Sequence, residues 1–122
     1  MKFLFIGLGH IGQRHLRNLY ALGHRDFFVY RIDDVAVPLE TEYHVTRLDS
    51  FEDGLMLKPD VVFITNPTVF HLEHARQALT AGCHVFIEKP VSHTLDGIDE
   101  LERIAREKYR VVFVGYQLRF HP

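Results

Sequence analysis

The 122 residues predict an α/β domain, a doubly wound parallel sheet of about six strands with helices on both faces. Two observations support this fold. Short apolar runs alternate with segments of helical spacing along the whole chain. The first apolar run leads directly into the glycine-rich segment Gly7-Leu8-Gly9-His10-Ile11-Gly12, which stands where a strand turns into its helix. Together they indicate a Rossmann-type arrangement, as one domain over residues 1–122.

The predicted strands are short runs of apolar, β-branched and aromatic residues, typical of parallel strands buried on both faces. We expect them at residues 2–6, 27–30, 43–46, 61–64, 84–87 and 111–114. The run at 43–46 is expected to be a short edge strand. Residues 31–41, which contain Pro38, are predicted to be a loop.

Four helices are predicted between these strands, at residues 11–22, 50–57, 69–81 and 94–108. Gly23 follows the first helix and is a natural stop. Asp49 or Ser50 is expected to cap the second helix, and Thr94 or Asp96 to begin the fourth. Because parallel strands need crossover connections, these helices should cover both faces of the sheet.

Composition and charge narrow the class of protein. The chain has 47% hydrophobic and 25% charged residues, as ordinary globular domains do. Its formal net charge of −2 argues against nucleic-acid binding, which favours basic domains. Cys83 is the single cysteine, so an intramolecular disulfide is excluded. The first apolar run is too short for a signal peptide or a membrane span, and we expect a cytoplasmic protein that binds no membrane.

The glycine segment predicts a dinucleotide-binding turn. Gly7 permits a tight turn, Gly9 lets the backbone approach a pyrophosphate, and Gly12 lets helix and strand pack closely. His10 and Ile11 lie inside the same segment, where helix N–H groups can face phosphates. The alternative is a merely structural glycine turn. The strand before the segment and the helix after it favour nucleotide binding.

The residues after the second strand choose between NAD and NADP. An acidic residue about twenty positions beyond the glycines would bind the ribose 2′-hydroxyl. Arg31 stands there instead and suits the 2′-phosphate of NADP. Asp33 and Asp34 follow and could bind the hydroxyl if the loop turned back, and Arg31 could be a solvated loop residue. We expect NAD or NADP, with a slight preference for NADP.

Two further strand ends lie on the sheet edge where α/β folds bind ligands. Asn66 and Pro67 follow the fourth strand, and their backbone is expected to line a nicotinamide ring; an ordinary strand-to-helix turn is the alternative. Lys89 follows the fifth strand, with Glu88 before it and Pro90 after it. Because Pro90 restricts the backbone, Lys89 is a candidate general acid/base beside the cofactor, and a solvent-exposed lysine is the alternative.

The three motifs together resemble the glucose–fructose oxidoreductase / inositol 2-dehydrogenase family (Gfo/Idh/MocA). They are the glycine segment, Asn66-Pro67-Thr68 with His71 after it, and Glu88-Lys89-Pro90; residues 114–120 are also similar. The resemblance implies an NAD(P)-dependent oxidoreductase that transfers hydride between its cofactor and a sugar, cyclitol or related secondary alcohol or ketone. It also implies that Lys89 is the acid/base, that Glu88 lies by the nicotinamide, and that the Lys89–Pro90 bond is cis.

The same resemblance implies a C-terminal substrate domain, which these 122 residues do not contain. We therefore expect the chain alone to bind cofactor without turning over substrate. In the full-length protein the second domain would bring the small-molecule substrate and the contacts of a homo-oligomer. The alternatives are a non-catalytic nucleotide-sensing module and a methyltransferase of the same fold. The Glu88-Lys89-Pro90 segment disfavours the methyltransferase, which has no use for it.

Nine histidines raise the question of a metal site. His71 and His74 have the i,i+3 spacing of two ligands on one helix, but no third ligand is evident in the sequence, and we predict no metal. We expect His71 near the nicotinamide pocket and His74 on the helix surface. His15 is expected to pack on the first helix.

Overall fold

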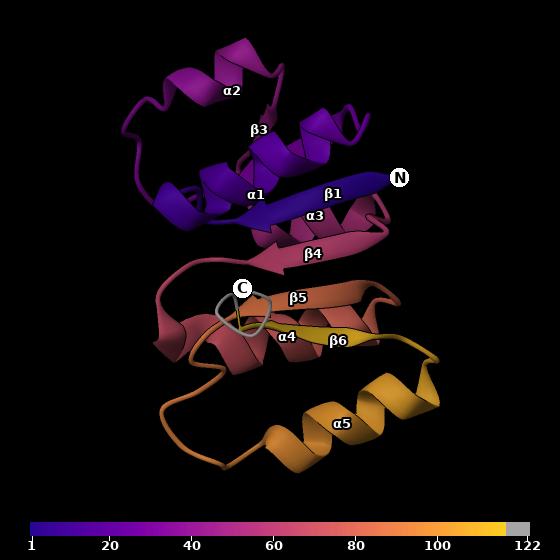
Figure 1. Ribbon diagram of the computed structural model, residues 1–122. Helices are drawn as coiled ribbons and strands as arrows, with labels where there is room; N and C mark the ends of the chain where they lie inside the picture. The colour runs from indigo at the N-terminus through magenta and orange to yellow at the C-terminus, as the bar shows by residue number, and fades with distance from the viewer. Residues whose placement is uncertain (117–122) are drawn as a thin grey trace, which may run out of the picture.

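Six parallel strands form the centre of the structure, and the computed structural model describes residues 1–116 (Figure 1). In chain order the elements are β1 (Lys2–Ile6), α1 (His10–Ala21), β2 (Asp26–Tyr30), α2 (Pro38–Glu42), β3 (Thr46–Leu48), α3 (Phe51–Met56), β4 (Val61–Ile64), the 3₁₀ turn η1 (Thr68–Phe70), α4 (His71–Thr80), β5 (His84–Glu88), α5 (Ile98–Glu107) and β6 (Val112–Gly115). Every neighbouring pair of strands is parallel, which confirms the predicted fold class.

The order of the strands sets the ligand-binding edge of the sheet. It is β3-β2-β1-β4-β5-β6. The strands β2 and β3 lie on one side of β1, and the chain then crosses back to place β4, β5 and β6 on the other side. The loops after β1 and β4 therefore diverge from the carboxyl ends of neighbouring strands. In open α/β sheets the crevice at this point of reversal is where ligands bind.

Alternate residues of the central strands are buried on opposite faces of the sheet. Phe3 and Phe5 of β1 belong to the core beneath α1 and α2, whereas Leu4 and Ile6 belong to the core shared with α3, α4 and α5. The helices therefore cover both faces of the sheet, as the alternating sequence pattern predicts (Figure 1).

A row of phenylalanine rings crosses four strands on the α1 face. Phe5, Phe63, Phe86 and Phe113 stack in turn, with ring centroids 4.9, 4.8 and 5.3 Å apart. Their strands are β1, β4, β5 and β6, which lie next to one another in the sheet. The row ends at the sheet edge, where Phe113 is 46% exposed.

The region between β2 and α3 differs from the sequence-based prediction. Residues 38–41, expected as loop, belong to the short helix α2, because Pro38 suits a first helical turn and Leu39 is buried in the core. The edge strand β3 begins at Thr46 rather than at residue 43. A turn occupies the preceding residues, with His44 in the left-handed region at φ 53°.

The helix ends agree with the prediction only in part. Ser50 caps α3 as expected, since its hydroxyl accepts a hydrogen bond from the Asp53 N–H at 3.0 Å. The helix predicted at 69–81 begins with the 3₁₀ turn η1, and α4 starts at His71. The last helix starts at Ile98, later than expected, directly after Gly97 at φ 86°.

Candidate active site

The glycine segment forms a close crossing between the loops that follow β1 and β4. Gly7 has a φ of 85°, and a Cβ atom on it would lie 3.1 Å from the Cα atom of Asn66. A Cβ atom on Gly12 would lie 2.9 Å from Thr65 Oγ1, the hydroxyl that donates to the Gly7 carbonyl at 2.8 Å. Gly9, in contrast, has no atom within 4 Å of its would-be Cβ, so it borders open space. The segment thus combines tight packing with one open glycine.

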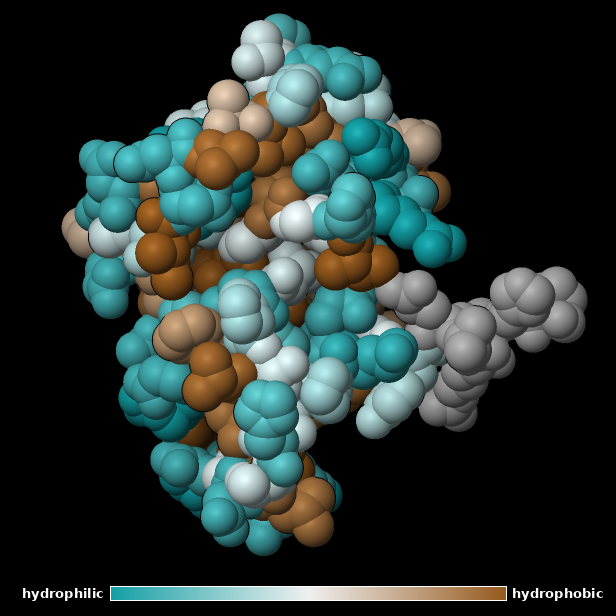
Figure 2. Space-filling view, turned by 90° about the vertical axis from the view of Figure 1, so that its left-hand side faces the viewer, coloured by the Kyte–Doolittle hydropathy of each residue, from teal (hydrophilic) through white to brown (hydrophobic). Residues whose placement is uncertain are grey.

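The open glycine faces a hollow of about 560 Å³ at the carboxyl edge of the sheet. The hollow is lined by Gly7–Gly9, by residues 30–33 after β2, by residues 65–67 after β4, and by His74. The first turn of α1, which holds His10 and Ile11, has no side-chain cap, so its N–H groups remain available to a ligand. This volume is typical of small-molecule sites. Figure 2 looks onto this edge, where hydrophobic and hydrophilic side chains alternate.

Arg31 borders the hollow but its guanidinium is held by protein groups. Nε lies 2.9 Å from a Glu40 carboxylate oxygen, and Nη1 donates to Asp33 Oδ1 at 3.1 Å. Nη2 donates to the Val35 carbonyl. The Arg31 side chain is 4% exposed, whereas that of Asp33 is 60% exposed. Arg31 therefore organises the loop after β2, and Asp33 presents an exposed carboxylate at the hollow.

A neighbouring hollow of about 470 Å³ lies at the end of β5. Lys89 and Pro90 line it together with the hydroxyl-bearing residues Ser92, Thr94 and Tyr116. Lys89 is exposed. The Lys89–Pro90 peptide bond is cis, as the family resemblance implied. The candidate acid/base is thus accessible at the end of the strand next to β4, but it is not among the residues that line the first hollow.

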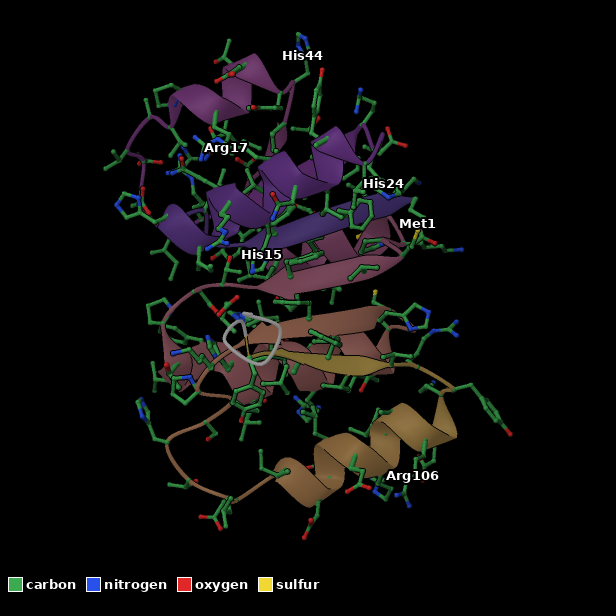
Figure 3. The ribbon with its side chains drawn as sticks, viewed as in Figure 1. Met1, His15, Arg17, His24, His44 and Arg106 are labelled. Carbon is green, nitrogen blue, oxygen red and sulfur yellow. The ribbon has the colours of Figure 1, made fainter. Side chains whose placement is uncertain are left out.

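Glu88 does not point into either hollow. One of its carboxylate oxygens lies 2.6 Å from Nε2 of His15, and the two side chains are 10% and 16% exposed. His15 comes from α1, on the side of that helix that faces the ends of β4 and β5 (Figure 3). Gly115 leaves room for the pair, since a Cβ atom there would lie 2.8 Å from the carboxylate. Glu88 therefore fastens the end of β5 to α1.

Two histidines of α4 hold Asn66. His71 Nε2 lies 2.7 Å from the Asn66 carbonyl oxygen, and His74 Nδ1 lies 3.0 Å from the Asn66 side-chain nitrogen. Burial lowers the pKa of His74, with smaller opposing effects from the carboxylates of Glu73 and Glu52. A neutral His74 suits this contact, because its unprotonated Nδ1 accepts from the amide.

Apart from Lys89, which lines the second hollow, the structure sorts the predicted cofactor residues into two groups. Most of them line the hollow or border its glycine loop: Gly7, Gly9, His10, Ile11, Gly12, Arg31, Asn66 and Pro67. His71 and Glu88 are not among the lining residues and are 1% and 8% exposed. They contact the residues that shape the site rather than open space.

Sequence reasoning missed three contributors to the site. Thr65 bridges the two loops, His74 holds Asn66 and is half-buried rather than on the surface, and His15 pairs with Glu88. His15 and Glu88 are 73 positions apart, and no local pattern links them. Thr65 precedes a motif that was recognised, which is the one signal that could have drawn attention to it.

The parallel sheet, the glycine loop and the hollow at the reversal point define a dinucleotide-binding Rossmann domain. Residues 1–116 match the GFO_IDH_MocA family model, described as an oxidoreductase family with an NAD-binding Rossmann fold. The chain belongs to this family, and the resemblance drawn from its motifs is confirmed. Its Gln117–Phe120 segment, part of that resemblance, lies outside the described residues.

Several relatives are dehydrogenases or oxidoreductases. UDP-N-acetylglucosamine 3-dehydrogenase of Acidithiobacillus ferrooxidans is 33% identical over 126 residues, covering 100% of this chain and 39% of that protein. Its solved structure has a TM-score of 0.88 at 31% identity, covering 100% of this chain and 40% of that one. An uncharacterized oxidoreductase of Bacillus subtilis, YrbE, is 33% identical and covers 96% of this chain and 36% of its own length.

The WlbA dehydrogenase of Chromobacterium violaceum, solved with NADH and UDP-GlcNAcA, has a TM-score of 0.87 at 25% identity, covering 98% of this chain and 36% of that one. The chain therefore spans well under half the length of these relatives. Within residues 1–116, no helix is both long and apolar enough to cross a membrane.

Proposed function

We propose that this chain is the NAD-binding domain of a dehydrogenase that interconverts a secondary alcohol of a sugar, sugar nucleotide or cyclitol with its ketone. The observation that carries the proposal is the exposed Lys89 at the end of β5, in a hollow next to the one bordered by the glycine loop. Relatives whose names include UDP-N-acetylglucosamine 3-dehydrogenase and myo-inositol 2-dehydrogenase support this substrate class.

On this proposal, some residues of the chain bind the cofactor and another transfers the proton. The backbone of Gly7–Gly9 and the first turn of α1 would hold the pyrophosphate, and Asn66 and Pro67 would border the nicotinamide. Bound NAD supplies the hydride acceptor. In oxidation, the amine form of Lys89 takes the hydroxyl proton as the carbinol C–H bond gives up its hydride; in reduction the ammonium form returns that proton to the carbonyl oxygen.

We further propose that the cofactor is NAD rather than NADP, which reverses the slight preference that Arg31 suggested in the sequence. The Arg31 guanidinium is 4% exposed and already paired with Glu40 and Asp33, so it has little to offer a 2′-phosphate. The exposed Asp33 carboxylate can accept a hydrogen bond from a 2′-hydroxyl and would repel a phosphate. Titration calorimetry should show NAD binding at least ~10-fold more tightly than NADP. Equal affinities would overturn the preference, and Asp33→Ser should narrow the gap.

We propose that the substrate-binding groups and the contacts of a homo-oligomer come from a further domain of a longer protein. The chain covers 36% to 40% of the relatives described above, which supports this division. On this proposal the 122 residues bind NAD but do not turn over substrate by themselves.

Substitution of Lys89 tests the proposed chemistry. In the protein that carries the substrate domain, Lys89→Ala should lower kcat by about 10²- to 10⁴-fold, the usual range for a general acid/base. The Kd for NAD should stay unchanged, because Lys89 lies outside the nucleotide hollow. Lys108→Ala, at the exposed end of α5, is the matched control and should not alter kcat. Unaltered turnover in Lys89→Ala, with NAD still bound, would favour a nucleotide-sensing module instead.

A further inference from the structure

His74 lines the nucleotide hollow, and only one of its two ring nitrogens is bound by the protein. The side chain comes from α4 and is half-buried. Nδ1 lies 3.0 Å from the side-chain nitrogen of Asn66. Within residues 1–116, no group forms a hydrogen bond with Nε2. Nε2 is therefore the ring atom that is left for a ligand in the hollow.

The contact with Asn66 decides which ring nitrogen of His74 carries the proton. An amide nitrogen only donates hydrogen bonds, so Nδ1 is the unprotonated acceptor and a neutral ring has its proton on Nε2. Burial lowers the pKa of His74, which favours the neutral ring at neutral pH. Nε2 is therefore a hydrogen-bond donor, and a ligand that binds it must bring an acceptor.

His74 lies on the adenosine side of the hollow. Its ring packs against the Phe51 ring, with centroids 4.8 Å apart. Phe51 begins α3, the helix that follows β3. The strands β3 and β2 lie on one side of β1, whereas β5, which leads to Lys89, lies on the other. Because the residues after the second strand of a dinucleotide-binding sheet bind the adenosine ribose, His74 is on the side away from the proposed reaction centre.

The surface near His74 suits a flat group with apolar faces. Ile32 and Pro67 line the same hollow, and Ile32 is 74% exposed. The Phe70 ring lies 6.2 Å from the His74 ring, centroid to centroid, and is 41% exposed. Apolar side chains with a few placed polar groups are typical of ligand pockets. Adenine fits this surface, because it is planar and its ring nitrogens accept hydrogen bonds.

We propose that His74 is an adenine-binding residue: its Nε2–H donates a hydrogen bond to a ring nitrogen of the base, and Asn66 keeps the proton on that side of the imidazole. The inference rests on the proposed binding of NAD. It deepens that proposal by assigning the group that recognises the base. The glycine loop and Asp33 are proposed to contact the pyrophosphate and a ribose hydroxyl, which are the same whatever the base.

Nuclear magnetic resonance of the ¹⁵N-labelled chain tests both parts of the proposal without any variant. Long-range ¹H–¹⁵N couplings of the His74 ring should show the proton on Nε2 and the lone pair on Nδ1 at neutral pH. Adding AMP should shift the Nε2 resonance. Ribose 5-phosphate and nicotinamide mononucleotide should not, because neither carries adenine. A proton on Nδ1, or an equal shift with ribose 5-phosphate, would overturn the proposal.

A substitution measures the contribution of the contact to affinity. His74→Phe keeps a ring beside Phe51 and removes the donor, so titration calorimetry should show NAD and AMP binding about 2- to 12-fold more weakly, the range for one neutral hydrogen bond. The affinity for nicotinamide mononucleotide should not change. His93→Phe replaces an exposed histidine that does not line the hollow and is the matched control, with no expected change.

Failure of this inference can be told apart from failure of the proposed function. A parent chain that binds no NAD would overturn both. NAD and AMP bound equally tightly by the parent chain and by His74→Phe would overturn the role of His74 alone. That outcome would leave the proposed NAD binding and the acid/base role of Lys89 intact.

Discussion

The two halves of the ligand-binding edge are built in different ways. The nucleotide half is mostly backbone: a left-handed Gly7, an open Gly9 and the uncapped first turn of α1. The Lys89 half is held by side chains that reach across the sheet, with His15 fastening Glu88 from one face and His71 reaching Pro90 from the other. The ligand-facing groups of the first half come from one short segment of the chain, whereas the second half depends on residues that are far apart in the sequence.

This difference explains which part of the site a short motif can reveal. A glycine is required wherever a Cβ atom has no room, and that requirement repeats at fixed spacing. A histidine that supports a strand end can come from any helix that brings its side chain within hydrogen-bond distance of that end. The partners in the Lys89 half are 73 and 19 positions apart, and no local pattern in the sequence links them.

The largest expected effect comes from substitutions in the nucleotide half of the edge. Two of its glycines distinguish a role in cofactor binding from a role in packing. Gly9→Ala places a methyl group in the open hollow and should weaken NAD binding at least ~100-fold in calorimetry, with unchanged stability, because nothing lies within 4 Å of that position. Gly12→Ala forces its methyl against Thr65 and should cost about 1–3 kcal/mol of stability in urea unfolding. The proposed difference between the two glycines would be contradicted if Gly9→Ala destabilised the fold and still bound NAD normally.

The next largest expected effect is a loss of stability when a supporting contact of the Lys89 half is removed. Glu88→Ala leaves the half-buried His15 without its partner, and hydrogen bonds to charged groups are worth about 1.5–3 kcal/mol, so urea unfolding should show a loss of that size. Glu88→Gln retains an acceptor and should cost less. Glu102→Ala removes an exposed ion pair with Arg106 and is the control, with an expected change below ~0.5 kcal/mol. A loss in Glu88→Ala no larger than in this control would contradict the proposed anchoring.

The smallest expected effect is on how stability depends on pH, through His74 in the nucleotide half. Because burial lowers the pKa of His74 below its ordinary 6.5, the unfolded chain binds a proton more readily than the folded chain does. Its contribution to stability is therefore present above pH 6.5 and is lost as the pH falls through the lowered value. His74→Gln keeps an acceptor for Asn66 and cannot titrate, so urea unfolding at pH 7.5 and 5.5 should show a smaller decline than in the parent chain. An identical decline in both proteins would exclude His74 as its source.

Much of the fold could be predicted from the sequence because its causes are local. Apolar runs such as residues 61–64 fixed the strands, and the glycine segment located the first crossover. Helix α2 was missed because its one buried anchor, Leu39, stands in a stretch that otherwise has the composition of a loop. The pairing of Arg31 with Glu40 could not be predicted for a related reason: Glu40 comes near only once α2 has formed.

The pairing of β6 with β5 gives the His15–Glu88 contact a further consequence. Gly115 stands opposite Glu88 in the parallel register, and a Cβ atom there would lie 2.8 Å from the Glu88 carboxylate and displace it. A slip of β6 by one residue would bring Val114 to that place and push its side chain against the His15–Glu88 pair. An edge strand is the easiest strand to misalign. Here a glycine opposite the His15–Glu88 pair favours the observed alignment of the edge strand.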